Sequence, residues 1–104
     1  MSTPNREVDV DFLVFVERYA TDLLKWDILT FFGQHPEACV SMPALARKIG
    51  RSMPAIRPEV GDLVLLGILE QGRAEADSEF TYQLTQDQQL RQMTIKFSHK
   101  QFTS

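Results

Sequence analysis

Three side chains in this 104-residue sequence could form a thiolate–imidazole catalytic pair or part of a Cys/His zinc site: Cys39, the only cysteine, and the two histidines, His35 and His99. A thiolate nucleophile needs a nearby base, and a structural zinc site needs several Cys or His ligands. None of the three lies in a local signature, so we expect Cys39 to be a small buried hydrophobe and both histidines to lie on the surface. The sequence also contains no glycine-rich phosphate loop, no HExxH and no GxSxG. We therefore expect a protein that is not an enzyme and has no metal or cofactor.

Charge is distributed unevenly along the chain, although the net charge is only −3. Between residues 38 and 57 there is no acid, and the segment carries four cations: Arg47, Lys48, Arg51 and Arg57. Residues 1–37 have seven acids against three bases, and residues 58–87 have seven acids against Arg73. Local potential matters more than the total when a surface meets a polyanion. The basic segment is therefore the candidate binding surface, with a solvated charged face as the alternative interpretation.

Length and composition indicate a single ordinary globular domain. The chain is 43% hydrophobic and 24% charged, which argues against disorder and low complexity. The longest apolar run, residues 12–16, is far shorter than the ~20 residues of a membrane span. We expect a flexible arm over residues 1–8, one domain over 9–104, no membrane association and a cytoplasmic location.

The elements that must position the basic segment can be predicted from periodicity and caps. Helices are expected at about 9–20 and 22–32, a short strand at 38–40, and two further helices, capped by Ser41 and Ser52 and separated by Gly50. A strand over 8–16 competes with the first helix, because apolar residues there partly alternate. A hairpin over about 68–84 and a final helix at about 86–101 complete the order, with Thr21 and the Thr85–Gln88 pair as helix caps.

The middle of the chain resembles a winged helix-turn-helix domain. The likeness covers about residues 24–84 and rests on the segment Ser41-Met-Pro-Ala-Leu-Ala-Arg-Lys-Ile-Gly-Arg-Ser-Met-Pro-Ala-Ile, followed by Val60, Leu63 and Gly67-Ile68-Leu69. This order is similar to that of bacterial regulators of the multiple-antibiotic-resistance and arsenical-resistance types. The resemblance implies a mainly helical fold with a small β-hairpin wing, extended here by additional N- and C-terminal helices.

That resemblance also implies a DNA site. In the family the second helix of the pair lies in the major groove, with its N-terminal side chains at base edges. Carried over by position, the residues facing bases are Ser52, Met53, Ala55 and Arg57, with Arg57 suited to bridge the two acceptors of guanine. Lys48, Arg51 and the Ser41 end of the supporting helix then lie near phosphates, and Arg73 is the cation of the wing.

Two features depart from the family pattern. Pro58 follows Pro54 by four residues and Gly61 is close behind, so the second helix is expected either to kink or to begin only near Pro58. The wing carries Glu75, Asp77 and Glu79, which phosphate repels.

Both terminal helices carry apolar stripes, and that of the first helix is wider than one neighbour in a small domain would cover. We expect them to form a homodimer interface that includes Phe12, Phe15, Tyr19, Leu90, Met93 and Phe97. Trp26 and several phenylalanines are expected to pack in the core, with an effector pocket as the alternative; the sequence identifies no effector.

The leading hypothesis is a homodimeric transcriptional regulator that binds double-stranded DNA. It requires Arg51 and Arg57 to be exposed and not paired with neighbouring carboxylates. The alternative is a winged helix that serves as a protein-interaction module without DNA binding.

Overall fold

The computed structural model describes residues 10–73 and 79–100, and contains five helices and one antiparallel sheet. The elements follow in the order α1 (Val10–Tyr19), α2 (Leu23–Gln34), β1 (Cys39–Ser41), α3 (Met42–Ile49), α4 (Met53–Leu65), β2 (Leu69–Arg73), β3 (Phe80–Leu84) and α5 (Gln88–Lys100). The mainly helical fold with a hairpin wing is confirmed, and residues 10–19 are helical rather than a strand. The expected arm over 1–8 lies outside the described residues.

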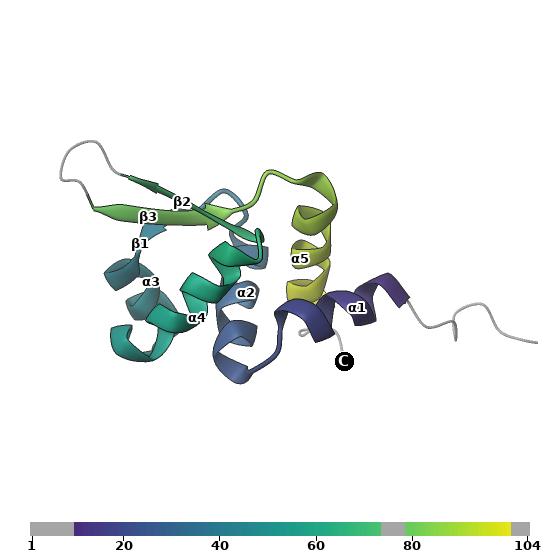
Figure 1. The fold of residues 1–104 in the computed structure, drawn as a ribbon, viewed down its shortest axis with the longest axis horizontal. Helices are drawn as coiled ribbons and strands as arrows, with labels where there is room; N and C mark the ends of the chain where they lie inside the picture. The colour runs from purple at the N-terminus through teal and green to yellow at the C-terminus, as the bar shows by residue number, and fades with distance from the viewer. Residues whose placement is uncertain (1–9, 74–78, 101–104) are drawn as a thin grey trace, which may run out of the picture.

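Helix α2 is the centre of the molecule. Figure 1 shows α3, α4 and the sheet on one side of it, and α1 and α5 on the other. Its fully buried residues Ile28, Leu29 and Phe32 pack into one core with apolar residues from both sides. Those partners include Leu45, Ile56, Val60, Leu63, Ile68, Leu84 and Phe97.

The caps of the helix pair follow from the sequence. Ser41 and Ser52 each have extended backbone geometry, and their hydroxyls accept hydrogen bonds from the backbone N–H groups of Ala44 and Ala55, both at 3.3 Å. Gly50 ends α3 in the left-handed conformation, with φ +74°, which is costly for a residue with a Cβ. The expectation for this turn is confirmed.

Two other caps differ from the expectation. Asp22, not Thr21, begins α2, and its carboxylate accepts the backbone N–H of Lys25 at 2.9 Å. At α5 the carboxylate of Asp87 accepts the backbone N–H of Leu90 at 3.0 Å, so the proposed Thr85–Gln88 capping box is wrong. The Thr85 hydroxyl instead accepts the backbone N–H of Asp87 at 3.1 Å. A local turn of this kind competes with capping for the same side chain.

The sheet has the order β1-β3-β2, with both pairs antiparallel. The hairpin pairs Leu69 with Leu84 and Arg73 with Phe80, while β1 pairs Val40 with Tyr82. The short strand expected near 38–40 therefore attaches the wing to the start of α3. The turn of the wing, residues 74–78, lies outside the described residues, and with it Glu75 and Asp77.

Helices α2 and α5 approach closely where Gly33 faces Thr94 and Ser98. A Cβ added to Gly33 would lie 2.5 Å from the Thr94 carbonyl oxygen and 2.6 Å from the Ser98 Cβ. Thr94 and Ser98 are fully buried, and their hydroxyls donate to the Leu90 and Ile95 carbonyl oxygens of their own helix. Only glycine fits this crossing without displacing α5.

The three side chains with reactive groups are dispersed. Both histidines are exposed, as expected. Cys39 is also exposed, which corrects the expected buried position, because it begins the edge strand β1. Among residues 10–73 and 79–100, no three His, Cys, Asp or Glu side chains come together in a way that could hold a metal. No helix in the same ranges is long and apolar enough to span a membrane.

Candidate nucleic-acid interface

The four cations of the basic segment all lie on the surface of the α3–α4 pair. Arg47 and Lys48 follow the buried Leu45 and Ala46 on the last turn of α3, and both are exposed. Arg51 lies in the turn between the helices, also exposed. Arg57 is exposed on α4, and within residues 10–73 and 79–100 it makes no ion pair. The fold thus displays the acid-free segment instead of burying it.

Helix α4 is one continuous helix from Met53 to Leu65, with Pro58 inside it. A start near Pro58 was therefore a wrong alternative, and the buried Ile56 and Val60 on either side of Pro58 explain why. Their packing outweighs the main-chain hydrogen bond that the proline cannot donate.

The side chains expected to face bases belong to the first two turns of α4. Ser52 is exposed but its hydroxyl is used as the helix cap, while Met53 and Ala55 are half-buried. Of the four, Arg57 is the long polar side chain that extends into solvent. The side chain of Arg73, the expected wing cation, lies outside the described residues.

Arg51 does not meet the expectation fully, because it pairs with a carboxylate on another helix. Its Nε and Nη2 both donate to Oδ2 of Asp27 on α2, at 2.9 and 2.6 Å. The two side chains are 44% and 35% exposed, so water and salt reach the pair. Exposed pairs of this kind contribute about 0–1 kcal/mol, which leaves Arg51 able to change partners.

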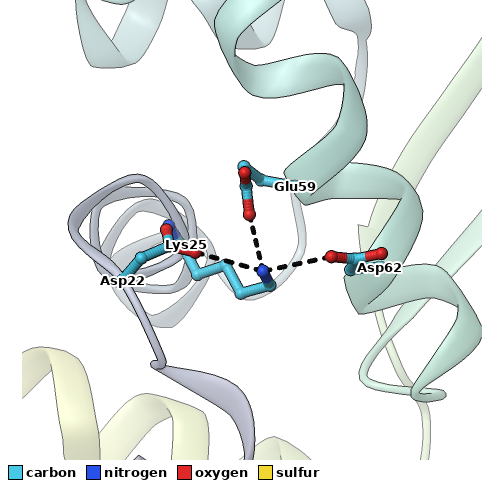
Figure 2. Close-up of polar contacts among 4 residues, drawn as sticks. All are labelled: Asp22, Lys25, Glu59 and Asp62. Atoms are coloured by element: carbon cyan, nitrogen blue, oxygen red, sulfur yellow. Dashed lines mark hydrogen bonds and ion pairs between the residues drawn. The ribbon is translucent and has the colours of Figure 1, made fainter.

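Sequence reasoning missed an ion cluster between α2 and α4, in which a buried lysine contacts three carboxylates that are 21% to 58% exposed. The side chain of Lys25 is 8% exposed, and its Nζ lies 2.5 Å from Oε1 of Glu59 and 3.2 Å from Oδ2 of both Asp22 and Asp62 (Figure 2). Glu59 and Asp62 come from one face of α4, and Asp22 is the cap of Lys25's own helix. Spacing in sequence gave no signal for this cluster, because Lys25 and Glu59 are 34 residues apart.

The contacts within the cluster stabilise the charged forms of Lys25 and Asp22. Burial disfavours the charged ammonium, but hydrogen bonds to Glu59, Asp22 and Asp62 outweigh this effect, so the pKa of Lys25 is raised above 10.5. Partial burial acts to raise the pKa of Asp22, yet hydrogen bonds from the backbone and side chain of Lys25 lower it below 3.8. Lys25 is therefore a permanent cation at neutral pH.

The carboxylate of Glu70 connects the wing to the start of α5. Glu70 on β2 accepts hydrogen bonds from the backbone N–H of Gln86 at 3.0 Å, the amide of Gln83 at 3.2 Å and the hydroxyl of Thr85 at 3.3 Å. These bonds, the one from Gln86 foremost, hold the pKa of Glu70 below its usual 4.5.

Arg91 on α5 has a structural role. It is 9% exposed, and its guanidinium donates to the carbonyl oxygens of Thr85 and Pro36 and to the carboxylate of Glu37. It ties α5 to the loop after α2 and does not contribute to a basic surface.

The candidate dimer residues divide into two groups. Phe15, Tyr19 and Phe97 are buried in the core of their own chain, where the Phe15 and Phe97 rings lie 5.8 Å apart. Phe15 and Tyr19 also line a cleft between α1 and α5. Phe12, Leu90 and Met93 are half-buried, and the apolar side chains that α1 exposes are those of Val10, Leu13 and Val14.

Trp26 belongs with these aromatic residues. Its ring packs edge-on against Phe97, with centroids 4.8 Å apart.

A cleft of about 580 Å³ lies between α1 and α5 and is lined by residues such as Val14, Arg18, Gln89 and Met93.

Comparison with known proteins relates the fold to regulators of gene expression. No family model and no curated protein sequence matches the chain. Among solved structures, HlyU from Vibrio cholerae superposes with a TM-score of 0.67 at 18% identity, over 94% of this chain and 99% of HlyU. The adhesin competence repressor AdcR from Streptococcus pyogenes gives 0.65 at 16%, over 96% and 74%. Reduced AbfR bound to DNA gives 0.64 at 14%, over 86% and 64%.

The chain therefore has a winged-helix fold, which it shares with HlyU and with the adhesin competence repressor. It spans 51% to 66% of the length of several other structures that it matches.

Proposed function

We propose that this protein is a transcriptional regulator that binds double-stranded DNA sequence-specifically as a homodimer in the cytoplasm. The observation that carries the proposal is the exposure of the acid-free basic segment on the α3–α4 pair, at the place where a winged helix meets DNA. The same architecture occurs in a solved complex of AbfR with DNA, which supports the proposal.

In this function α4 enters the major groove and the side chains around it have different tasks. Arg57 reads a base, because its guanidinium can donate to both acceptors of a guanine. Ser52, Met53 and Ala55 line the start of the helix and set how closely it approaches the base edges.

The residues that contact phosphates in this function lie around α4. Lys48 and Arg51 bind phosphates on either side of the turn, and the N-terminal N–H groups of α3 at Ser41 donate to another. Arg51 exchanges Asp27 for phosphate as the complex forms. Arg73 is proposed to serve the wing, on the strength of the resemblance alone.

The dimer contact uses the exposed apolar face of α1, Val10, Leu13 and Val14, together with the half-buried Phe12, Leu90 and Met93. This face lies across α2 from the basic surface, so a two-fold pair leaves both α4 helices free (Figure 1). Such a dimer reads two half-sites about 34 Å apart.

The test is binding by fluorescence anisotropy to duplexes that the wild-type protein selects from a random library. We expect Arg57→Ala to weaken binding to the selected duplex by about 5- to 150-fold and to relax preference at one base pair of each half-site. Arg47→Ala is the matched control, because it removes the same charge from the same helix pair. It should lower affinity for all duplexes alike, without relaxing preference.

The outcome against the proposal is a wild-type protein that binds no duplex even at low salt, where counterion release favours association most.

One observation favours the alternative, a protein-interaction module. The outer face of α4 offers few groups that read bases, since Pro58, Gly61 and Leu65 lie there and Leu65 is 86% exposed. These residues border a cleft of about 490 Å³ between α4 and the sheet. Neutralising both Arg51 and Arg57 separates the two functions. Loss of DNA binding with intact folding supports the regulator, whereas the module shows no nucleic-acid phenotype.

A further inference from the structure

Helix α4 is poorly stabilised by its own sequence. It contains Pro54, Pro58 and Gly61 among 13 residues, and Pro58 lacks the N–H that would bond one turn back. The turn that carries Arg57 is therefore held less by its main-chain hydrogen bonds than an ordinary helical turn. Contacts with other elements must supply the missing constraint.

Lys25 supplies two such contacts, both just after the weak turn. Its Nζ binds Glu59, the residue that follows Pro58, and Asp62, one turn further along (Figure 2). Two attachment points on one face, three residues apart, oppose rotation of α4 about its axis. Apolar packing of Ile56, Val60 and Leu63 also holds one face of α4 on the core, and the Lys25 contacts add two polar attachment points of defined geometry.

The geometry of an α-helix sets where Arg57 points once Glu59 is fixed. With about 100° of rotation per residue, Arg57 lies about 160° from Glu59 and 140° from Asp62 around the helix. A rotation of α4 about its axis that breaks the Lys25 contacts would turn Arg57 around the axis by the same angle.

We propose that Lys25 is a positioning residue for DNA recognition: through Glu59 and Asp62 it fixes the rotation of α4, and so the direction in which Arg57 meets the bases. This inference rests on the proposed function. Lys25 itself contacts no DNA, because its side chain is covered by α2 and α4 and is 8% exposed.

Two variants break the same contact with opposite changes of charge. Lys25→Met makes the protein more negative by one, and the double variant Glu59→Gln with Asp62→Asn makes it more positive by two. Electrostatic changes alter the affinity for every duplex alike. A lower folded fraction likewise scales all affinities equally. The ratio of affinities for the selected duplex and a scrambled duplex therefore reports positioning alone.

We expect this ratio to fall about tenfold in both variants, the equivalent of one lost base contact. Lys25→Arg, which keeps a cation in the cluster, should restore most of the ratio. Lys96→Met, which removes a lysine from α5, should leave it at the wild-type value. If Lys25→Met does not fold, the double variant, in which Lys25 keeps Asp22, carries the test. A ratio within twofold of wild type in the folded variants would overturn the inference.

Hydrogen exchange provides a readout that needs no DNA. Amide hydrogens of α4 should exchange faster in both variants than in wild type. Amide hydrogens of α3 should change only by as much as the change in the global free energy of unfolding accounts for. If the wild-type protein selects no duplex, the proposed function fails. If α4 exchange is also unchanged in both variants, the Lys25 contacts do not hold α4 in place.

Discussion

Arg51 donates two hydrogen bonds, from Nε and Nη2, to a single carboxylate oxygen of Asp27, at 2.9 and 2.6 Å. The pair connects the turn before α4 to α2, and both side chains remain partly exposed. In the absence of DNA, a proposed phosphate-binding arginine is thus already occupied by an anion. Binding DNA requires this internal contact to be exchanged for a phosphate.

Asp27→Asn should therefore strengthen DNA binding. Removing the competing carboxylate recovers the cost of breaking the pair, about 0–1 kcal/mol, or up to about fivefold in affinity. Fluorescence anisotropy at one fixed salt concentration measures the change. Glu17→Gln, an equal change of charge on the exposed face of α1, serves as the control. If both variants gain equally, Asp27 has no specific hold on Arg51.

Gly33→Ala should destabilise the fold strongly. The new Cβ would lie 2.5 Å from the backbone oxygen of Thr94, and a backbone atom cannot rotate away, so α2 and α5 must separate. We expect a loss of about 1–3 kcal/mol in the free energy of unfolding, measured by urea titration. Gly61→Ala is the control, because a Cβ there meets nothing within 4 Å. It should stabilise by about 0.5–1 kcal/mol through helix propensity, and equal effects of the two variants would refute the close crossing.

Acid should weaken the contact between the wing and α5. The folded pKa of Glu70 lies below 4.5, so its stabilising contribution is complete above about pH 4.5 and disappears as the pH falls through the folded value. Glu70→Gln should therefore be less stable than wild type at pH 7, and the difference should shrink below pH 4.5. Urea titrations of both proteins between pH 3 and 7 measure this. Glu17→Gln controls for general charge effects. If the difference in the free energy of unfolding between Glu70→Gln and wild type does not depend on pH, the charge of Glu70 does not stabilise the fold.

Leu13→Glu should convert the proposed dimer to a monomer. Leu13 is 49% exposed on the apolar face of α1, and a carboxylate there would be buried without a partner in the dimer. Light scattering at micromolar concentration should give a mass near 11.9 kDa for the variant and about twice that for wild type. Leu65→Glu, on α4, is the control, because Leu65 is more exposed and belongs to a helix outside the proposed dimer contact. A wild-type mass near that of one chain would reject the dimer.

Local patterns in the sequence were sufficient to predict the order of elements around the candidate site. Ser41, Gly50 and Ser52 act within three or four residues of their own positions, through caps and a left-handed turn, so their effect can be read without knowing the fold. Leu45, Ile56 and Val60, which help to carry the family resemblance in the sequence, are all buried in the fold. The absence of acids between 38 and 57 predicted an exposed basic surface, since so many like charges cannot share an interior.

What only the tertiary structure decided are the partners of charged side chains. Lys25, Arg51 and Arg91 read in the sequence simply as cations, yet one is buried among three carboxylates, one is paired at the surface and one holds two loops together. The same holds for Phe15 and Phe97: their apolar stripes led us to expect them at a homodimer interface, and in the fold both are buried in the core of their own chain. Periodicity along a helix determines which face is apolar. The packing of distant segments determines what covers that face, because the energy of an ion pair or an apolar contact depends on distance in space and solvent exposure, which spacing along the chain does not fix.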